Sequence, residues 1–178
     1  MNANHHHPDG FMPDWQAIVD QHGPVVWRTA HRLLADEAEA ADCFQETFVA
    51  VVHASNGAPI QNWAALLRKI ATARALDRLR RRIDESRQTL NASDWDGFAS
   101  PLPGPGEEVA ARELADQARQ ALVHLPARQA EVLCLRCLEE LSYEEIAEHL
   151  HIRVNAVGVL LHKARKRMRK MLNLAESD

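Results

Sequence analysis

Apolar residues recur every three to four positions along most of the chain, and this period predicts helices rather than strands. Alanine and leucine dominate, and β-branched residues seldom cluster, which favours the same structure. The first periodic stretch covers residues 14–35. Its apolar positions are Trp15, Ile18, Val19, Val25, Val26, Ala30, Leu33 and Leu34. Gly23-Pro24 lies inside it, so we expect either one kinked helix or two helices.

Two more helices are predicted in the N-terminal half. Asp36 is placed to cap the first of them, with Glu39 at the matching position of a capping box. The buried face of this helix should consist of Ala40, Phe44, Phe48 and Val51. After a break, the other helix should run from near Asn62 past Arg80. Three helices of this length can enclose one small core.

Residues 91–106 separate this unit from the rest of the chain. They contain three prolines and three glycines, a composition typical of an extended linker. We therefore expect a disordered leader over residues 1–13, a first domain over 14–88, a linker over 89–106 and a second domain over 107–174. Trp95 and Phe98 are unusual in a linker. They either cover a neighbouring surface of the same chain or anchor the linker in a partner's groove.

The clearest pattern lies in the C-terminal half. One helix is expected over residues 108–124, and a second begins at Leu125-Pro126, because proline suits a first helical position. Ser142 opens a short helix, with Glu145 three residues later as in a capping box. A turn follows, and the last helix carries apolar residues at a three-four spacing: Val154, Val157, Leu161, Ala164, Met168 and Met171. Ala147, Ile152 and Val157 should point inward. A short helix, a tight turn and a longer helix predict a DNA-binding helix-turn-helix.

Charge is distributed unevenly along the chain, although the net charge is only -4. Residues 36–46 hold five acidic and no basic residues, whereas residues 68–82 hold seven basic residues and one acidic residue. Residues 153–172 hold seven basic and no acidic residues. An acidic protein can therefore carry two basic patches suited to phosphate. On the last helix the spread of bases around the axis suits phosphate contact better than base reading.

The three cysteines, Cys43, Cys134 and Cys137, indicate a reducing compartment, because their number is odd and no secretory leader precedes them. Cys134 and Cys137 lie one turn apart, and we expect buried structural thiols rather than a metal site. No segment reaches the length of a membrane span, so we expect a cytoplasmic protein. The histidines at residues 5–7 are either native or the remnant of a tag. Nothing indicates an enzyme, a metal or a cofactor.

Specific motifs then point to a family. The C-terminal ones are Leu125-Pro126, Arg128, Leu141-Ser142, Glu145-Ile146-Ala147 and Lys163-Ala164-Arg165 with Met168. They resemble region 4 of the extracytoplasmic-function (ECF) group of bacterial RNA polymerase sigma factors. Two N-terminal elements resemble region 2 of the same group: Ala40, Asp42, Gln45, Glu46, Thr47 and Phe48, then Trp63, Ile70, Ala71, Asp77 and Arg80, with Leu67 a looser match. The resemblance covers roughly residues 14–174, in the family's order.

The resemblance implies a sigma factor that binds the β′ and β subunits of core RNA polymerase and recognises the −10 and −35 promoter elements. It implies that a coiled coil of β′ contacts Asp42, Gln45 and Glu46. The bases implied at the −10 element are Arg68, Lys69, Arg74, Arg78, Arg80, Arg81 and Arg82. The residues left for the −35 element are Arg153, Asn155, His162, Lys163, Arg165 and Lys166. Trp63 begins an apolar stripe, so we expect it in the core rather than stacked on a base.

The sequence departs from the family pattern at two places that should read bases. Ala73 stands where the family usually has asparagine, and alanine offers a base edge no hydrogen bond. Residues 156–160 replace several polar groups of the recognition helix with apolar side chains and Gly158. Readout there should depend more on phosphates and DNA shape. Two alternatives to a sigma factor follow: a sigma-like DNA-binding regulator that does not direct initiation, or a degenerate module that titrates an anti-sigma partner.

Overall fold

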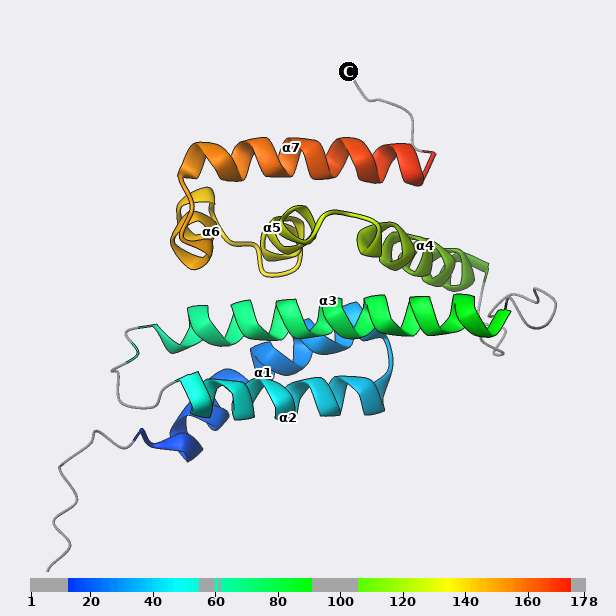
Figure 1. The fold of residues 1–178 in the computed structure, drawn as a ribbon. Helices are drawn as coiled ribbons and strands as arrows, with labels where there is room; N and C mark the ends of the chain where they lie inside the picture. The colour runs from blue at the N-terminus through cyan, green and yellow to red at the C-terminus, as the bar shows by residue number, and fades with distance from the viewer. Residues whose placement is uncertain (1–12, 55–59, 61, 91–105, 174–178) are drawn as a thin grey trace, which may run out of the picture.

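The structure, a computed structural model, describes residues 13–54, 60, 62–90 and 106–173, and side chains at 87–90 and 106–108 are left out of the description. Helices are the only regular elements of these residues, as the sequence predicts (Figure 1). They are α1 (Trp15–Leu34), α2 (Glu37–Ala54), α3 (Trp63–Leu90), α4 (Gly106–Val123), α5 (Ala127–Cys137), α6 (Tyr143–Leu150) and α7 (Val154–Met171). The predicted leader and most of the predicted linker, with Trp95 and Phe98, lie outside the described residues.

The first helix, α1, is continuous. It begins after Asp14, whose carboxylate accepts a hydrogen bond from the Ala17 amide at 3.0 Å. The helix continues through Gly23-Pro24, so the alternative of two separate helices is wrong. Proline removes only one backbone donor, and tertiary packing offsets that loss. Gly23 is buried against Phe44, where a β-carbon would lie 3.5 Å from the ring.

Helices α1, α2 and α3 pack together as the N-terminal unit. The Asp36 cap predicted for α2 is present, since the Glu39 amide donates to the Asp36 carboxylate at 2.8 Å, while the Glu39 carboxylate pairs with Arg82. Asn62 caps α3 by accepting from the Ala65 amide at 2.9 Å. The buried interior includes Val26, Ala40, Val51, Leu67, Leu76 and Leu79. Phe44 and Phe48 are only partly buried. Trp63 packs edge-on against Trp15, with ring centroids 5.5 Å apart, as expected for a core residue.

Helices α4 to α7 form the C-terminal unit, in which α6 and α7 make the predicted helix-turn-helix. Ile146, Ala147 and Leu150 of α6 are buried, as are Val157, Leu161 and Ala164 of α7. Val154 and Met171, which share the three-four spacing, are exposed at the two ends of α7. Helical period assigns a residue to a face, but an end residue is buried only where a neighbouring element extends over it.

The two units pack directly on each other. Helix α3 lies against α4, α5 and α6, and α7 lies on the far side of those helices (Figure 1). One cluster of buried apolar residues joins Leu33 and Ile83 of the first unit to Leu122 and Leu133 of the second. The surfaces that carry α2 and α7 therefore lie on opposite sides of the molecule.

Candidate nucleic-acid interface

The outer face of α7 is basic and unpaired. The six residues predicted for −35 recognition are all exposed on or beside this helix. Among the described residues, no ion pair involves any of them. Of the neighbouring bases, Arg167 makes a contact within the described part of the protein, donating to Gln129 at 2.9 Å. This face is free to bind phosphate.

The turn between α6 and α7 sets the direction of α7, and it is held by hydrogen bonds between residues close in the chain. Ser142 and Glu145 form the predicted capping box: the Glu145 amide donates to the Ser142 hydroxyl at 3.1 Å, and the Ser142 amide donates to the Glu145 carboxylate at 2.7 Å. The hydrogen bond from the Ser142 backbone holds the pKa of Glu145 below its ordinary value. His151 then takes a left-handed conformation, with φ of 52°, and the Ile152 amide donates to the Ala147 carbonyl. The angle between α6 and α7 is therefore set locally.

Gly158 lowers the helical stability of α7 near its N-terminal end. It packs near Tyr143, and a β-carbon at this position would lie 3.6 Å from the tyrosine ring, an ordinary contact. We expect Gly158→Ala to raise the free energy of unfolding by about 0.5–1 kcal/mol, because alanine loses less backbone entropy in a helix. Urea unfolding followed by circular dichroism measures it. Ala156→Gly, the reverse change on the same helix, should lower the free energy of unfolding by a similar amount. A change of the same sign in both variants would show that helix propensity does not determine their stability.

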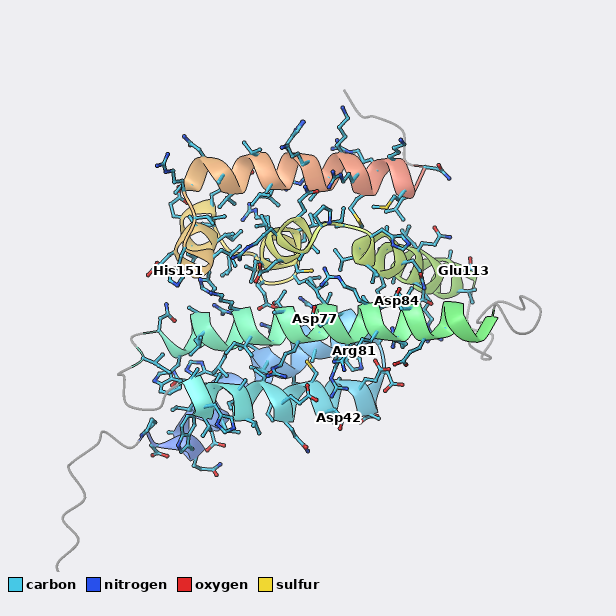
Figure 2. The ribbon with its side chains drawn as sticks, viewed as in Figure 1. Asp42, Asp77, Arg81, Asp84, Glu113 and His151 are labelled. Atoms are coloured by element: carbon cyan, nitrogen blue, oxygen red, sulfur yellow. The ribbon has the colours of Figure 1, made fainter. Side chains whose placement is uncertain are left out.

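On α3, most of the bases predicted to bind the −10 element have protein partners. Five of the seven have them: Arg68, Arg74, Arg78, Arg80 and Arg82. Arg82 bridges to Glu39 at 3.1 Å and also donates to the Leu34 carbonyl. Within the described part of the chain, Lys69 and Arg81 have no such partner, and Arg81 is exposed (Figure 2). The free positive charge of α3 is therefore smaller than the sequence suggests.

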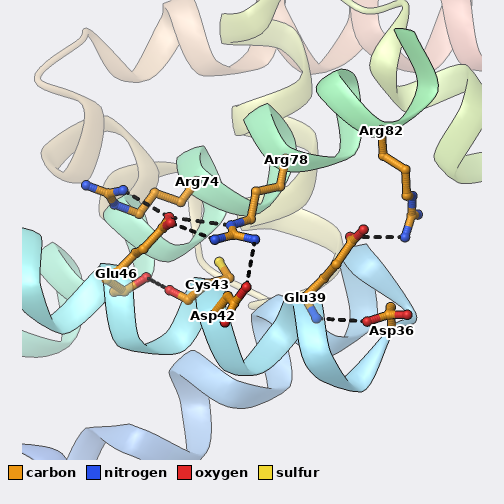
Figure 3. Close-up of polar contacts among 9 residues, drawn as sticks. Asp36, Glu39, Asp42, Cys43, Glu46, Arg74, Arg78 and Arg82 are labelled. Carbon is orange, nitrogen blue, oxygen red and sulfur yellow. Dashed lines mark hydrogen bonds and ion pairs between the residues drawn. The ribbon is translucent and has the colours of Figure 1, made fainter. Parts of the chain in front are cut away.

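Arg78 joins α3 to the acidic face of α2 (Figure 3). Its Nη2 donates to Glu46 Oε1 at 2.6 Å, and its Nη1 lies 3.6 Å from Asp42 Oδ2. Arg74 reaches the other oxygen of Glu46 at 3.3 Å. The hydrogen bond from Arg78 holds the pKa of Glu46 below its ordinary value. Residues that the sequence assigned to two partners, polymerase and DNA, thus contact each other, while Gln45 stays exposed.

A buried charge links the two units, and sequence reasoning missed it. Glu139, just after α5, has a side chain only 1% exposed. It accepts a hydrogen bond from Thr29 of α1 and pairs with Arg68 of α3, whose Nε lies 3.5 Å from Glu139 Oε2. Thr29 and Glu139 are 110 positions apart. A carboxylate just after a helix gives no sequence signal that it will pair with residues so far away in the chain.

The same junction contains a buried histidine. His149 of α6 is buried, and its Nε2 finds no hydrogen-bond partner among the described residues. Burial is the largest effect and lowers the pKa of His149 below its ordinary value of 6.5. A backbone hydrogen bond with Glu145 opposes it, and the charge of Arg68 lowers the pKa further against the weaker opposing charges of Glu148 and Glu145. The folded protein therefore keeps this imidazole neutral.

That neutral histidine predicts acid sensitivity. Above pH 6.5 neither the folded nor the unfolded chain protonates His149, so its full contribution to stability is present. As the pH falls below 6.5, the unfolded chain binds the proton first and stability decreases. The urea concentration at the unfolding midpoint should therefore decrease when the pH is lowered from 7.5 to 5.5. His149→Gln should show a smaller fall; an equal fall would assign the pH dependence to other groups.

The cysteines divide differently from the expectation. Cys134 is buried, as predicted, but Cys137 is exposed, so the prediction was wrong for that thiol. Cys43, for which no burial was predicted, is also buried. Burial raises the pKa of Cys134 far above its usual range, which makes it unreactive. Among the described residues, no cluster of three potential ligands could hold a metal ion.

Together the helix-turn-helix, its free basic face and a second basic helix define a helical DNA-binding protein. Family models narrow this class: Sigma-70 region 2 matches residues 18–83, and Sigma-70 region 4 matches residues 115–168. The chain belongs to the sigma-70 family of RNA polymerase sigma factors, in its ECF group. Members of this family direct promoter-specific transcription initiation and are not enzymes.

Curated relatives agree with this assignment. The ECF RNA polymerase sigma factor SigE of Mycolicibacterium smegmatis is 33% identical over 94% of this chain, which spans 65% of that protein's length. The RNA polymerase sigma factor CnrH of Cupriavidus metallidurans is 31% identical, with 90% of this chain and 87% of CnrH covered. SigW of Bacillus subtilis is 28% identical, with 87% of each chain covered.

Solved structures share the fold. CnrH in complex with the cytosolic domain of CnrY superimposes with a TM-score of 0.57 at 23% identity, covering 91% of this chain and 89% of that one. The sigma factor RpoE from Bartonella quintana, in complex with the anti-sigma factor NepR, gives 0.55 at 19% identity, covering 93% and 100%. No helix in the described part of the chain is long and apolar enough to cross a membrane.

Proposed function

We propose that this chain binds core RNA polymerase in the cytoplasm and directs it to promoters, with α2 on the polymerase, α3 at the −10 element and α7 at the −35 element. The observation that carries this proposal is the outer face of α7, where exposed bases lie on the second helix of a helix-turn-helix and make no ion pair with any residue that the structure describes. The chain supplies recognition, and the chemistry belongs to the polymerase.

The contacts on α2 and α3 refine the proposed roles of individual residues. Asp42 and Gln45 are exposed on α2 and suit a basic surface of the polymerase. Asp42 lies on the side of the molecule remote from α7 (Figure 2). Lys69 and Arg81 are the α3 bases best placed to bind phosphate. Arg74 and Arg78, held by Glu46, are better suited to fixing α3 on α2 than to binding DNA directly.

An anti-sigma factor is a further proposed partner. An apolar groove of about 420 Å³ lies between α1, α4, α5 and α7. Leu33, Leu122 and Leu133 lie along it, and its lining includes Arg32, Arg119, Arg165 and Arg169. An amphipathic helix with acidic residues would match both features. The complexes of the two solved relatives with CnrY and NepR support such a partner for this chain.

A run-off transcription assay with purified core polymerase and genomic promoter fragments tests the function. We expect specific transcripts only when this chain is added. Binding to DNA without any specific transcript would favour the regulator alternative. Absence of both DNA binding and transcripts, with retained binding to an anti-sigma protein, would favour the titrating module.

A further inference from the structure

The centre of the outer face of α7 is an apolar side chain. Val159 is 54% exposed, although it lies on a face that is otherwise polar and basic. At 3.6 residues per turn, Asn155 and Lys163 lie one turn before and after it, and Lys166 follows on the same face. An exposed valine surrounded by such groups gains nothing from its position in the free protein.

The neighbours of Val159 allow this part of the helix to approach another surface closely. Ala156 and Gly158 carry almost no side chain, and Gly158 packs toward Tyr143 of α6. Leu160 turns inward against the core. The short side chain of Val159 can therefore reach the surface of a DNA duplex whose phosphates are bound by the longer lysines of the same face.

One group on the edges of DNA bases complements an apolar side chain in the major groove. The C5-methyl of thymine is the apolar group that a base pair exposes there, whereas the other groups are hydrogen-bond donors and acceptors. We infer that Val159 reads a thymine methyl in the −35 element, and this inference rests on the proposed placement of α7. The apolar residues that replace the usual polar ones thus specify sequence by shape and methyl contact.

Uracil tests the inference, because deoxyuridine lacks the methyl but keeps the hydrogen-bonding edge of thymine. Holoenzyme, assembled from the full chain and core polymerase, selects promoters from DNA duplexes randomised in the −35 half. Each thymine of the selected −35 element is then replaced by deoxyuridine, one at a time. At one position, binding should weaken by about three- to fourfold, the value for one buried methyl group.

The same replacement is repeated with Val159→Ala holoenzyme. We expect this variant to bind the thymine promoter several-fold more weakly and to be insensitive to deoxyuridine at that one position, which is the signature of a direct coupling. Leu114→Ala is the matched control, since Leu114 is 53% exposed on α4 and should leave the deoxyuridine effect unchanged. Circular dichroism confirms that both variants are folded.

Three results would overturn the inference. In the first, no deoxyuridine position affects wild-type holoenzyme. In the second, the deoxyuridine effect persists in Val159→Ala. In the third, Val159→Ala impairs assembly with core polymerase rather than promoter binding, which would place Val159 against protein. Failure of wild-type holoenzyme to select any duplex would instead reject the proposed function itself.

Discussion

Replacing Glu139 by glutamine should separate the two units of the molecule in solution. Glutamine keeps an oxygen for Thr29 but removes the negative charge beside Arg68. Removing one partner of a buried ion pair costs roughly 3–5 kcal/mol. The Arg68 side chain is 28% exposed, so solvent reduces this cost. We expect the free energy that favours the packed over the separated units to decrease by about 2 kcal/mol.

Small-angle X-ray scattering measures this change directly. A loss of about 2 kcal/mol shifts the balance between packed and separated units roughly thirtyfold, so the radius of gyration should increase. Glu131→Gln is the matched control, because Glu131 also pairs with an arginine, Arg128 at 3.0 Å, but within α5. An unchanged radius of gyration for folded Glu139→Gln would show that the apolar cluster alone holds the units together.

The Glu139 contact also bears on the DNA-binding role predicted for Arg68. While the units are packed, the Arg68 guanidinium faces Glu139 and cannot bind a phosphate from that side. A contact between the Glu139-facing side of Arg68 and the −10 element would therefore require the units to move apart.

The elements that the sequence predicted well are governed by contacts between residues close in the chain. The capping box of Ser142 and Glu145 needs only a spacing of three, and the inward positions of α7 repeat at helical period. Gly23-Pro24 shows the limit of such rules, because packing against Phe44 keeps α1 continuous where local chemistry allowed a break.

The pairing of charges could not be predicted, because it depends on contacts between distant residues. Arg74 and Arg78 lie 28 and 32 positions from Glu46, and runs of like charge in sequence look like free surface. Exposure could not be predicted for the same reason. The helical period placed Cys137 on a helix, but no sequence rule shows that no other element covers its side of that helix. Family resemblance identified the protein class, whereas the free residues of its sites emerge only from the fold.

Neutralising three lysines of α7 should greatly weaken promoter binding by the holoenzyme. Lys163, Lys166 and Lys170 are exposed and lie one turn apart along the outer face of α7. Each phosphate contact contributes about 0.9 to the slope of log affinity against log salt concentration. The triple change to glutamine should therefore reduce the slope by nearly three, and lower affinity on the order of a hundredfold at physiological salt. Filter binding at salt concentrations between about 50 and about 400 mM, where such effects are large, would measure both the slope and the affinity.

A charge-matched variant separates this local effect from net charge. Arg28, Arg112 and Arg128 are exposed on α1, α4 and α5, and changing all three to glutamine removes the same charge away from α7. Equal slopes for the two triple variants would contradict phosphate binding by α7. Because phosphates carry no sequence information, the lysine variant should lose affinity for selected and unrelated duplexes alike, whereas Val159→Ala should lose it only where a thymine methyl is present.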